Sequence, residues 1–309
     1  KNTTGCSFDV YCDCLCSHFH VLCLLVGVSM GFSVTVPAGC GEFLQGRVGN
    51  RSVIISTPVN AYVKAIVNDG IYDEKLLGEK SRQAVQRADS ICGGRPFDKV
   101  LEIQSDIPKG KGMASSSADI GACALAVARH KGHVFSDEEL CRLAVSIEPT
   151  DPVFCRGVVA MDRYSGQLLR RFPAPRLVYY TFDCGGMINT QDFYSTRTVE
   201  DEPDVTDLYK DLCRNNGDID TWCRVATTSA LANQSRVFKS ELPDFYETAQ
   251  KIGAYGIGTA HTGTLLNMIF SSRGYGQKIK KVLSNSRLKG LKFIGVFETI
   301  GGGYVFEER

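Results

Sequence analysis

The sequence lacks the marks of several common classes of protein. Lys and Arg total 35 and Asp and Glu total 34, so the net charge is only +1, and the basic residues are spread along the chain. This distribution argues against a dedicated nucleic-acid-binding surface. The apolar stretch at 21–30 is too short to cross a bilayer, and no basic region precedes it as a signal peptide would require. We therefore expect no nucleic-acid partner, no membrane partner and a cytoplasmic location.

The sequence also lacks the paired C-x-x-C spacing of a zinc finger. Of 13 cysteines, five fall in the first 25 residues, where two histidines accompany them: Cys6, Cys12, Cys14, Cys16, Cys23, His18 and His20. Their spacing matches no standard metal site, so a metal site is the weaker interpretation. Regular alternation starts only after Met30. We expect Met30 to be the natural start and residues 1–29 to be a non-native or disordered extension.

The remaining composition is that of a globular protein, with 43% hydrophobic and 22% charged residues. A chain of 309 residues suffices for one large or two medium domains. Cys123 and Cys141 lie in apolar helical patterns and are predicted to be inert core residues. Alternating apolar residues predict strands at 32–37, 53–58, 61–67, 100–104, 158–162, 167–172, 177–183, 265–270, 291–297 and 303–307. Helices are predicted at 75–88, 118–130, 137–147, 204–214, 218–237, 243–253 and 275–285.

Interleaved strands and helices in both halves predict an α+β protein of two domains. The proline-containing segment 172–176 is the best candidate for a linker. We accordingly place the N-terminal domain at 30–173 and the C-terminal domain at 174–309.

The most informative segment is "PKGKGMASSSAD" at 108–119, between a predicted strand and an alanine-rich helix. Gly110 and Gly112 allow close backbone approach, and the first turn of a helix attracts anions. The segment is not a P-loop, because no Lys-Ser or Lys-Thr follows the glycines, and it is not a dinucleotide fingerprint. A Gly/Ser turn capped by serines is also how ordinary connections are built, so phosphate binding needs support elsewhere in the chain.

Three further segments supply that support: "VPAGCGEFLQG" at 36–46, "EPTD" at 148–151 and "GIGTAHTGT" at 256–264. With the 108–119 loop, this set resembles the motifs of the GHMP small-molecule kinases over nearly the whole chain from about residue 34. The resemblance implies an N-terminal domain with a left-handed β-α-β crossover, a ferredoxin-like C-terminal domain, and ATP bound at their junction. The usual rule for crossovers predicts the opposite hand.

Within that family the segments resemble the L-threonine kinases of propanediol utilisation and cobalamin biosynthesis, which make O-phospho-L-threonine from ATP and L-threonine. The chain departs from that pattern at Gly39, Ser117 and Pro152, and none of these changes removes a group needed for phosphate, metal or proton handling. A kinase for another small alcohol, such as homoserine or a sugar, and a non-catalytic member that only binds a ligand remain as alternatives. A monomer or a homodimer is expected.

The resemblance also assigns roles to residues. The nucleotide is expected along Pro108, Lys109, Gly110, Lys111, Gly112, Met113, Ala114, Ser115, Ser116 and Ser117. Either Lys109 or Lys111 could neutralise phosphate charge. Ser115 or Ser116 is expected to bind Mg²⁺ together with Glu148, because this ion prefers oxygen ligands shared with phosphates. Asp151 is expected to be the general base. Taken alone, Glu148 could equally cap a helix end and Asp151 could form an Asx turn.

The acceptor is expected beside Glu42 and Gln45, where a buried carboxylate could pair with the ammonium group of an amino acid. Thr259, His261, Thr262 and Gly263 are expected to form a second wall near the acceptor and the phosphates. No arginine stands out from the sequence as the partner of a substrate carboxylate.

Overall fold

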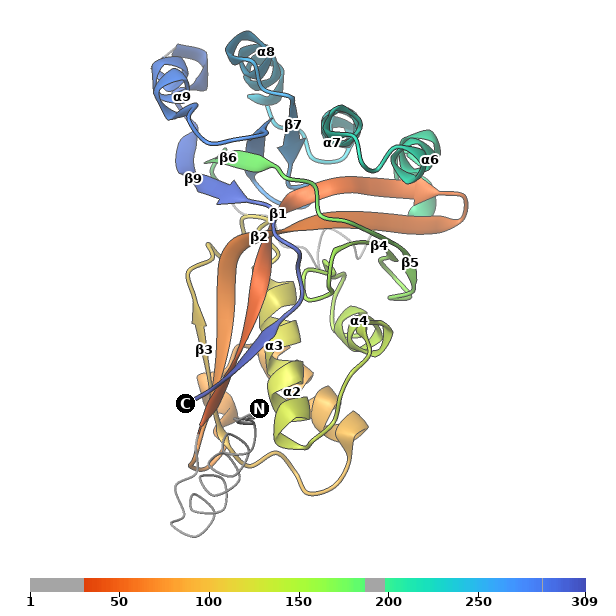
Figure 1. Cartoon of the computed structure of the whole chain (residues 1–309), viewed down its shortest axis with the longest axis vertical. Helices are drawn as coiled ribbons and strands as arrows, with labels where there is room; N and C mark the ends of the chain where they lie inside the picture. Colours follow the sequence, from red (N-terminus) through yellow and green to blue (C-terminus); the bar gives the residue numbers. More distant parts are fainter. Residues whose placement is uncertain (1–30, 187–197, 285) are drawn as a thin grey trace, which may run out of the picture.

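The computed structural model describes residues 31–186, 198–284 and 286–309. The predicted extension at 1–29, with its cysteines and histidines, lies outside these residues. The spine of the molecule is an antiparallel pair of long strands, β1 (Phe32–Val48) and β2 (Arg51–Asn68). In Figure 1 this pair runs through both parts of the molecule, so its two ends belong to different layers.

Two predicted breaks in this spine are wrong, and both have the same cause. The strand predicted to end at residue 37 continues to Val48 as β1, and the two strands predicted at 53–58 and 61–67 are the single strand β2. The ladder shifts register between Pro37 and Ala38 and again between Gly39 and Glu42. Such β-bulges bend a strand without ending it, and they also accommodate residues that cannot donate to the ladder.

At one end of the spine, β3 (Val100–Ser105) pairs with β2 and the last strand, β10 (Val305–Glu308), pairs with β1. Three helices pack against this part (Figure 1): α2 (Glu79–Cys92), α3 (Ser115–His130) and α4 (Asp137–Val145). Eleven of the residues of α3 are buried, which explains its alanine-rich sequence because only small side chains let neighbours approach on all sides.

At the other end, the sheet continues in the order β5-β4-β2-β1-β7-β8-β6-β9. The added strands are β4 (Val158–Asp162), β5 (Leu168–Phe172), β6 (Val178–Asp183), β7 (Gly256–Thr259), β8 (Leu265–Phe270) and β9 (Lys292–Glu298). The accompanying α-helices are α6 (Thr206–Arg214), α7 (Ile219–Ala232), α8 (Leu242–Ile252) and α9 (Gly276–Leu283). Short 3-10 helices occur at Glu74–Leu76, Val199–Asp201, Asn233–Ser235 and Ser286–Leu288.

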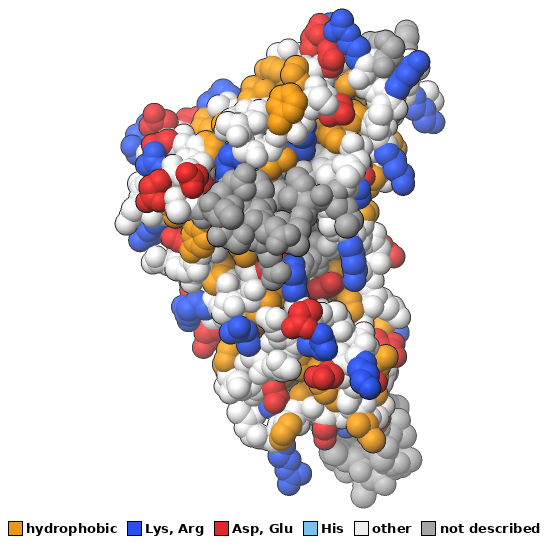
Figure 2. All heavy atoms as spheres, turned by 180° about the vertical axis from the view of Figure 1, so that it is seen from behind, with side chains coloured by type: hydrophobic (Ala, Val, Ile, Leu, Met, Phe, Trp, Pro, Cys, Tyr) orange, Lys and Arg blue, Asp and Glu red, His pale blue; other side chains and the backbone are white. Residues whose placement is uncertain are grey.

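The predicted α+β class is therefore confirmed, with the strands joined in one sheet. The apolar core that contains Val34 also contains Trp222, so packing is continuous across residue 173, and the domain boundary there stays a prediction. Cys123 and Cys141 are fully buried, as predicted. Within the described ranges, none of the helices is long and apolar enough to cross a membrane. On the face shown in Figure 2, acidic and basic side chains are interspersed.

Candidate functional site

The glycine-rich loop before α3 is fixed by backbone hydrogen bonds from two distant segments. The Gly39 and Gly41 N–H groups of β1 donate to the Met113 and Gly112 carbonyl oxygens at 3.1 and 2.9 Å. The Thr264 N–H, from the loop between β7 and β8, donates to the Lys111 carbonyl oxygen at 3.0 Å. The structure thus brings together three of the segments singled out in the sequence, which lie far apart along the chain.

Close packing of this loop requires glycine at residue 112. Gly112 has φ of +97°, and a Cβ there would lie 2.2 Å from the Cβ of Ala260. The next positive φ belongs to Ala114, at 54°, the one non-glycine residue with this backbone among those the structure describes. A left-handed alanine costs about 1 kcal/mol, and such strain persists only where the surrounding structure imposes it. Here it turns the chain sharply into the first turn of α3.

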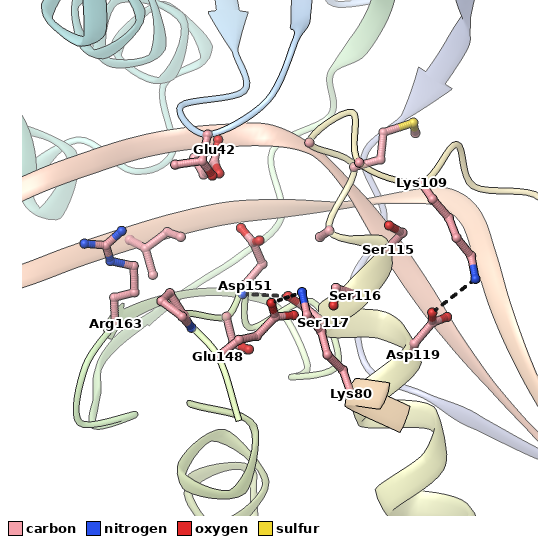
Figure 3. A pocket seen from close by; sticks show the side chains of 18 residues that line it. Glu42, Lys80, Lys109, Ser115, Ser116, Ser117, Asp119, Glu148, Asp151 and Arg163 are labelled. Atoms are coloured by element: carbon pink, nitrogen blue, oxygen red, sulfur yellow. Dashed lines mark hydrogen bonds and ion pairs between the residues drawn. The ribbon is translucent and has the colours of Figure 1, made fainter. Parts of the chain in front are cut away.

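A cavity of about 290 Å³ lies against this turn. The residues that line it are Glu42, Ile54, Lys80, Lys109, Gly110, Gly112, Met113, Ala114, Ser115, Ser116, Ser117, Asp119, Glu148, Pro149, Thr150, Asp151, Arg163 and Thr262. Figure 3 shows Ser115, Ser116 and Lys109 on one side of Asp151 and Arg163 on the other, with Glu42 across the cavity from Glu148. The first turn of α3, a favourable place for an anion, therefore faces a cavity rich in carboxylates and basic side chains.

Asp151 is held in the cavity by two serines. Its backbone N–H donates to the Ser117 hydroxyl at 3.0 Å, and the Ser56 hydroxyl donates to its carboxylate. Burial raises the pKa of the Asp151 carboxyl to about 7, with the negative charges of Glu42 and Glu148 acting in the same direction. A carboxyl with a pKa close to neutral can both accept and release a proton at physiological pH.

Glu148 and Asp119 bring two more carboxylates to the same cavity. Glu148 is buried and paired with Lys80 of α2, while Asp119 lies 3.9 Å from the ammonium group of Lys109. Burial raises the pKa of Asp119 to about 6, with Glu148 adding to the shift and Lys109 opposing it. These ion pairs bring two basic side chains to the edge of the cavity, where an anionic ligand would meet them.

The donor set also fits a Mg²⁺ ion. Glu148 Oε1 and Asp119 Oδ1 are buried oxygens that accept no hydrogen bond from the described part of the chain. The Ser115 and Ser116 hydroxyls face the same cavity. Carboxylate and hydroxyl oxygens are the ligands that Mg²⁺ prefers, usually together with substrate phosphates. Among described residues, no three His, Cys, Asp or Glu side chains form a metal-holding group by themselves.

Glu42, on the other side of the cavity, is fixed by the loop after β7. The His261 backbone N–H donates to Glu42 Oε2 at 2.6 Å, and the His261 ring packs 3.4 Å from the same oxygen. The Ser229 hydroxyl of α7 lies 2.8 Å from His261 Nε2. Burial alone raises the pKa of Glu42, but the hydrogen bonds and charge from His261 outweigh it, so the pKa lies below its ordinary value. Glu42 is therefore a buried anion at neutral pH.

The structure divides the predicted site residues into two groups. Those that line the cavity are Lys109, Gly110, Gly112, Met113, Ala114, Ser115, Ser116, Ser117, Glu42, Glu148, Asp151 and Thr262. Those that do not line it are Pro108, Lys111, Gln45, Thr259, His261 and Gly263. Of the two loop lysines, Lys111 pairs with Asp183 at 2.7 Å, which leaves Lys109 as the one at the cavity. Gln45, Thr259 and His261 are buried behind the cavity wall.

Sequence reasoning missed Lys80, Asp119 and Arg163, which also line the cavity. Asp119 could have been found, because it follows Ser115 by four residues and so lies on the same face of the helix. Lys80 and Arg163 belong to no recognisable sequence motif. Only their contacts with Glu148 and Glu202, which are distant in the sequence, connect them to the site.

Comparison with known proteins agrees with this geometry. Residues 79–156 match the family described as GHMP kinases N terminal domain. A homoserine kinase from Cytophaga hutchinsonii has a TM-score of 0.65 at 15% identity, covering 91% of this chain and 98% of its own. A mevalonate kinase from Methanococcus jannaschii has a TM-score of 0.63 at 11% identity, covering 87% and 98%. The chain thus carries a GHMP kinase N-terminal domain and has the GHMP kinase fold, which confirms the resemblance seen in its motifs.

Sequence comparison with individual kinases gives a more specific similarity. The L-threonine kinase of Salmonella typhimurium is 26% identical over 266 residues, covering 82% of this chain and 87% of that protein. A homoserine kinase from Clostridium botulinum is 28% identical over 142 residues, covering 41% of this chain and 46% of that protein. The chain is thus similar to L-threonine kinases over most of its length, and to a homoserine kinase over less than half of it.

Proposed function

We propose that this protein transfers the γ-phosphoryl group of ATP to the side-chain hydroxyl of L-threonine. The product, O-phospho-L-threonine, would serve the aminopropanol phosphate linker of cobalamin. The observation that carries the proposal is the position of Asp151, a half-buried carboxyl in the same cavity as the first turn of α3 and its serines. This position supports the proposal, because phosphoryl transfer to an alcohol needs a proton acceptor close to a group that favours anions, such as the first turn of a helix.

The phosphates of ATP belong at the loop side of the cavity. The N–H groups at the start of α3 and the ammonium group of Lys109 would bind them, and Lys80 would hold Glu148 in place. Glu148 with Ser115 or Ser116 would hold Mg²⁺, which when bound neutralises charge on the phosphates.

The acceptor belongs between Asp151 and Glu42. The threonine hydroxyl oxygen forms a bond to the γ-phosphorus while the bond to the β–γ bridging oxygen breaks, and ADP leaves. The hydroxyl proton passes to Asp151, whose pKa of about 7 suits this transfer near neutral pH. Glu42, ionised and buried, pairs with the ammonium group of the amino acid.

The direct test is ADP release by the purified protein with MgATP and a panel of acceptors: L-threonine, L-serine, L-homoserine, mevalonate and galactose. We expect kcat/KM for L-threonine to exceed that for each of the others by about tenfold or more. No turnover of L-threonine would refute the assignment. Turnover of homoserine instead would establish the second candidate, which the partial match to a homoserine kinase favours.

A non-catalytic role is the third possibility, and the same assay addresses it. Intact Ser115, Ser116, Glu148 and Asp151 around one cavity speak against it. ATP binding measured by calorimetry, together with no ADP release for any acceptor, would leave only this role.

A further inference from the structure

Arg163 is a buried arginine in the wall of the cavity, and the reaction proposed above gives it no task. It follows β4 directly, its side chain is 1% exposed, and it lines the cavity together with Asp151 and Glu42. In Figure 3 it lies on the far side of Asp151 from Ser115 and Lys109, at the end of the cavity away from the phosphate-binding turn.

A compact charge cluster holds this side chain in place. The Arg163 guanidinium donates to Glu202, which also accepts a hydrogen bond from the Ser52 hydroxyl at 2.7 Å. A second arginine, Arg236, lies 3.9 Å from the same carboxylate. The Arg163 backbone N–H donates to the Ser52 carbonyl oxygen at 2.8 Å, so main chain and side chain are both fixed.

The net charge of this cluster determines which ligand groups can bind beside it. Arg163, Arg236 and Glu202 carry charges that sum to +1 in a buried place. An uncompensated buried charge is costly, so an anionic ligand group beside the cluster would offset its excess positive charge. The positive field reaches the reaction centre, because the charge of Arg163 opposes the other influences that raise the pKa of Asp151.

We propose that Arg163 binds the carboxylate of the acceptor, opposite Glu42, so that the site selects hydroxyl-bearing α-amino acids over other alcohols. A guanidinium is suited to this task because its planar fork matches the two oxygens of a carboxylate. The assignment rests on the proposed phosphorylation of an amino acid and identifies the group that recognises the acceptor. A zwitterion would meet a carboxylate at its ammonium end and a guanidinium at its carboxylate end, with its hydroxyl near Asp151.

Other acceptor classes do not match this pair of charges. A sugar carries neither charge, so it would leave Glu42 and Arg163 without partners from the ligand. Mevalonate has a carboxylate but lacks an ammonium group. A site built around buried charges discriminates strongly against ligands that lack the complementary group, because desolvating an unpaired charge is expensive.

The test compares two acceptors that differ only at the carboxylate: L-threonine and L-threonine amide. For the unaltered protein we expect kcat/KM to fall about 100-fold for the amide, mainly through KM. For R163K, which keeps the charge but loses the fork, the preference for the acid should shrink about tenfold or more. ADP release measures both, and ATP binding measured by calorimetry should be unchanged in the variant.

Arg236 provides the matched control, because it contacts the same Glu202 but does not line the cavity. R236K should disturb the buried cluster to a similar extent and yet keep the full preference for the acid. A structural role of Arg163 would instead make the two variants behave alike. Should R163K fail to fold, the double variant R163Q/E202Q removes both charges together and supports the same comparison.

The outcomes separate this inference from the proposed function. If the unaltered protein phosphorylates L-threonine and its amide equally well, or if R163K lowers both rates by the same factor, Arg163 does not bind the carboxylate while the kinase assignment stands. If the acceptor panel yields only alcohols without a carboxylate, both proposals fall. The inference is supported if R163K loses the preference for L-threonine over its amide and R236K keeps it.

Discussion

The two glycine-rich segments of this chain look alike in sequence but occupy different places in the structure. The first, at 108–117, supplies much of the cavity wall, whereas the second, at 256–264, contributes only Thr262 to the lining. The rest of the second segment packs behind the wall, where Ala260 contacts Gly112 and the His261 N–H fixes Glu42. Glycine therefore signals close backbone approach in both segments, because a Cβ at Gly112 would clash with Ala260 and one at Gly263 would clash with the Lys111 carbonyl oxygen.

The largest effect is expected from replacing Asp151, which lines the cavity beside the first glycine-rich segment. Asp151→Asn should lower kcat about 1000-fold, because the proton acceptor is lost, while ATP binding is largely kept. Single-turnover ADP release and calorimetric ATP binding measure the two effects. Full activity of the variant would contradict the role of Asp151.

The same variant should also change how the free energy of unfolding depends on pH. The folded-state pKa of Asp151 is about 7, above the ordinary value of 3.8, so its contribution to stability is complete below pH 3.8 and is lost as pH rises to about 7. Denaturant unfolding should therefore show Asp151→Asn gaining stability relative to the unaltered protein as pH rises from 4 to 8. The opposite trend would mean that the carboxyl is ionised and stabilised in the fold.

The contact between the two segments predicts the next largest effect. Gly112→Ala places a Cβ 2.2 Å from that of Ala260 and should cost about 3 kcal/mol in urea unfolding, with activity lost in parallel. Adding Ala260→Gly should restore the part due to the clash. Gly94→Ala, at φ of +77° with open space around it, measures the backbone cost alone, about 1 kcal/mol. Equal losses in Gly112→Ala and Gly94→Ala would mean that the segments are not in close contact.

The pH dependence of the reaction provides a fourth test. Because Asp151 must be ionised to accept a proton and its pKa is raised to about 7, kcat/KM should fall about tenfold per pH unit below pH 7. Asp119, with a pKa raised to about 6, titrates in the same direction at lower pH. An initial-rate profile from pH 5 to 9 tests this, and a flat profile between pH 5 and 7 would argue against a neutral-range base.

The smallest effect concerns the support that the first segment provides to Asp151. Ser117→Ala removes the acceptor for the Asp151 N–H and should lower kcat about threefold to tenfold, with about 1 kcal/mol lost in stability. Ser146→Ala is the matched control, since the Ser146 hydroxyl donates to the Leu143 carbonyl oxygen in a helix end outside the cavity. A similar loss of stability with unchanged kcat is expected there. The comparison fails if the two variants lose activity alike.

Much of the fold could be predicted from local pattern, and the exceptions have local causes. The helix predicted at 118–130 is α3, which begins three residues earlier at Ser115, because the serines enter the first turn rather than precede it. The strands predicted at 158–162 and 167–172 are β4 and β5, which pair antiparallel. The long strands β1 and β2 were predicted as fragments, because Pro37 and Pro58 read as strand ends when the bulges that accommodate them are set by pairing with another strand.

The sequence by itself determined the order of a strand, a Gly/Ser loop and a helix, because all three are encoded in one contiguous stretch. It also singled out Glu42, Glu148 and Asp151 as candidates. Only the tertiary structure decided that Lys80 and Arg163 join them and that Lys111, Gln45 and His261 do not line the cavity. The physical reason is that backbone geometry follows neighbouring residues, whereas the charges around a cavity are assembled from strands and helices that meet only when the core has packed.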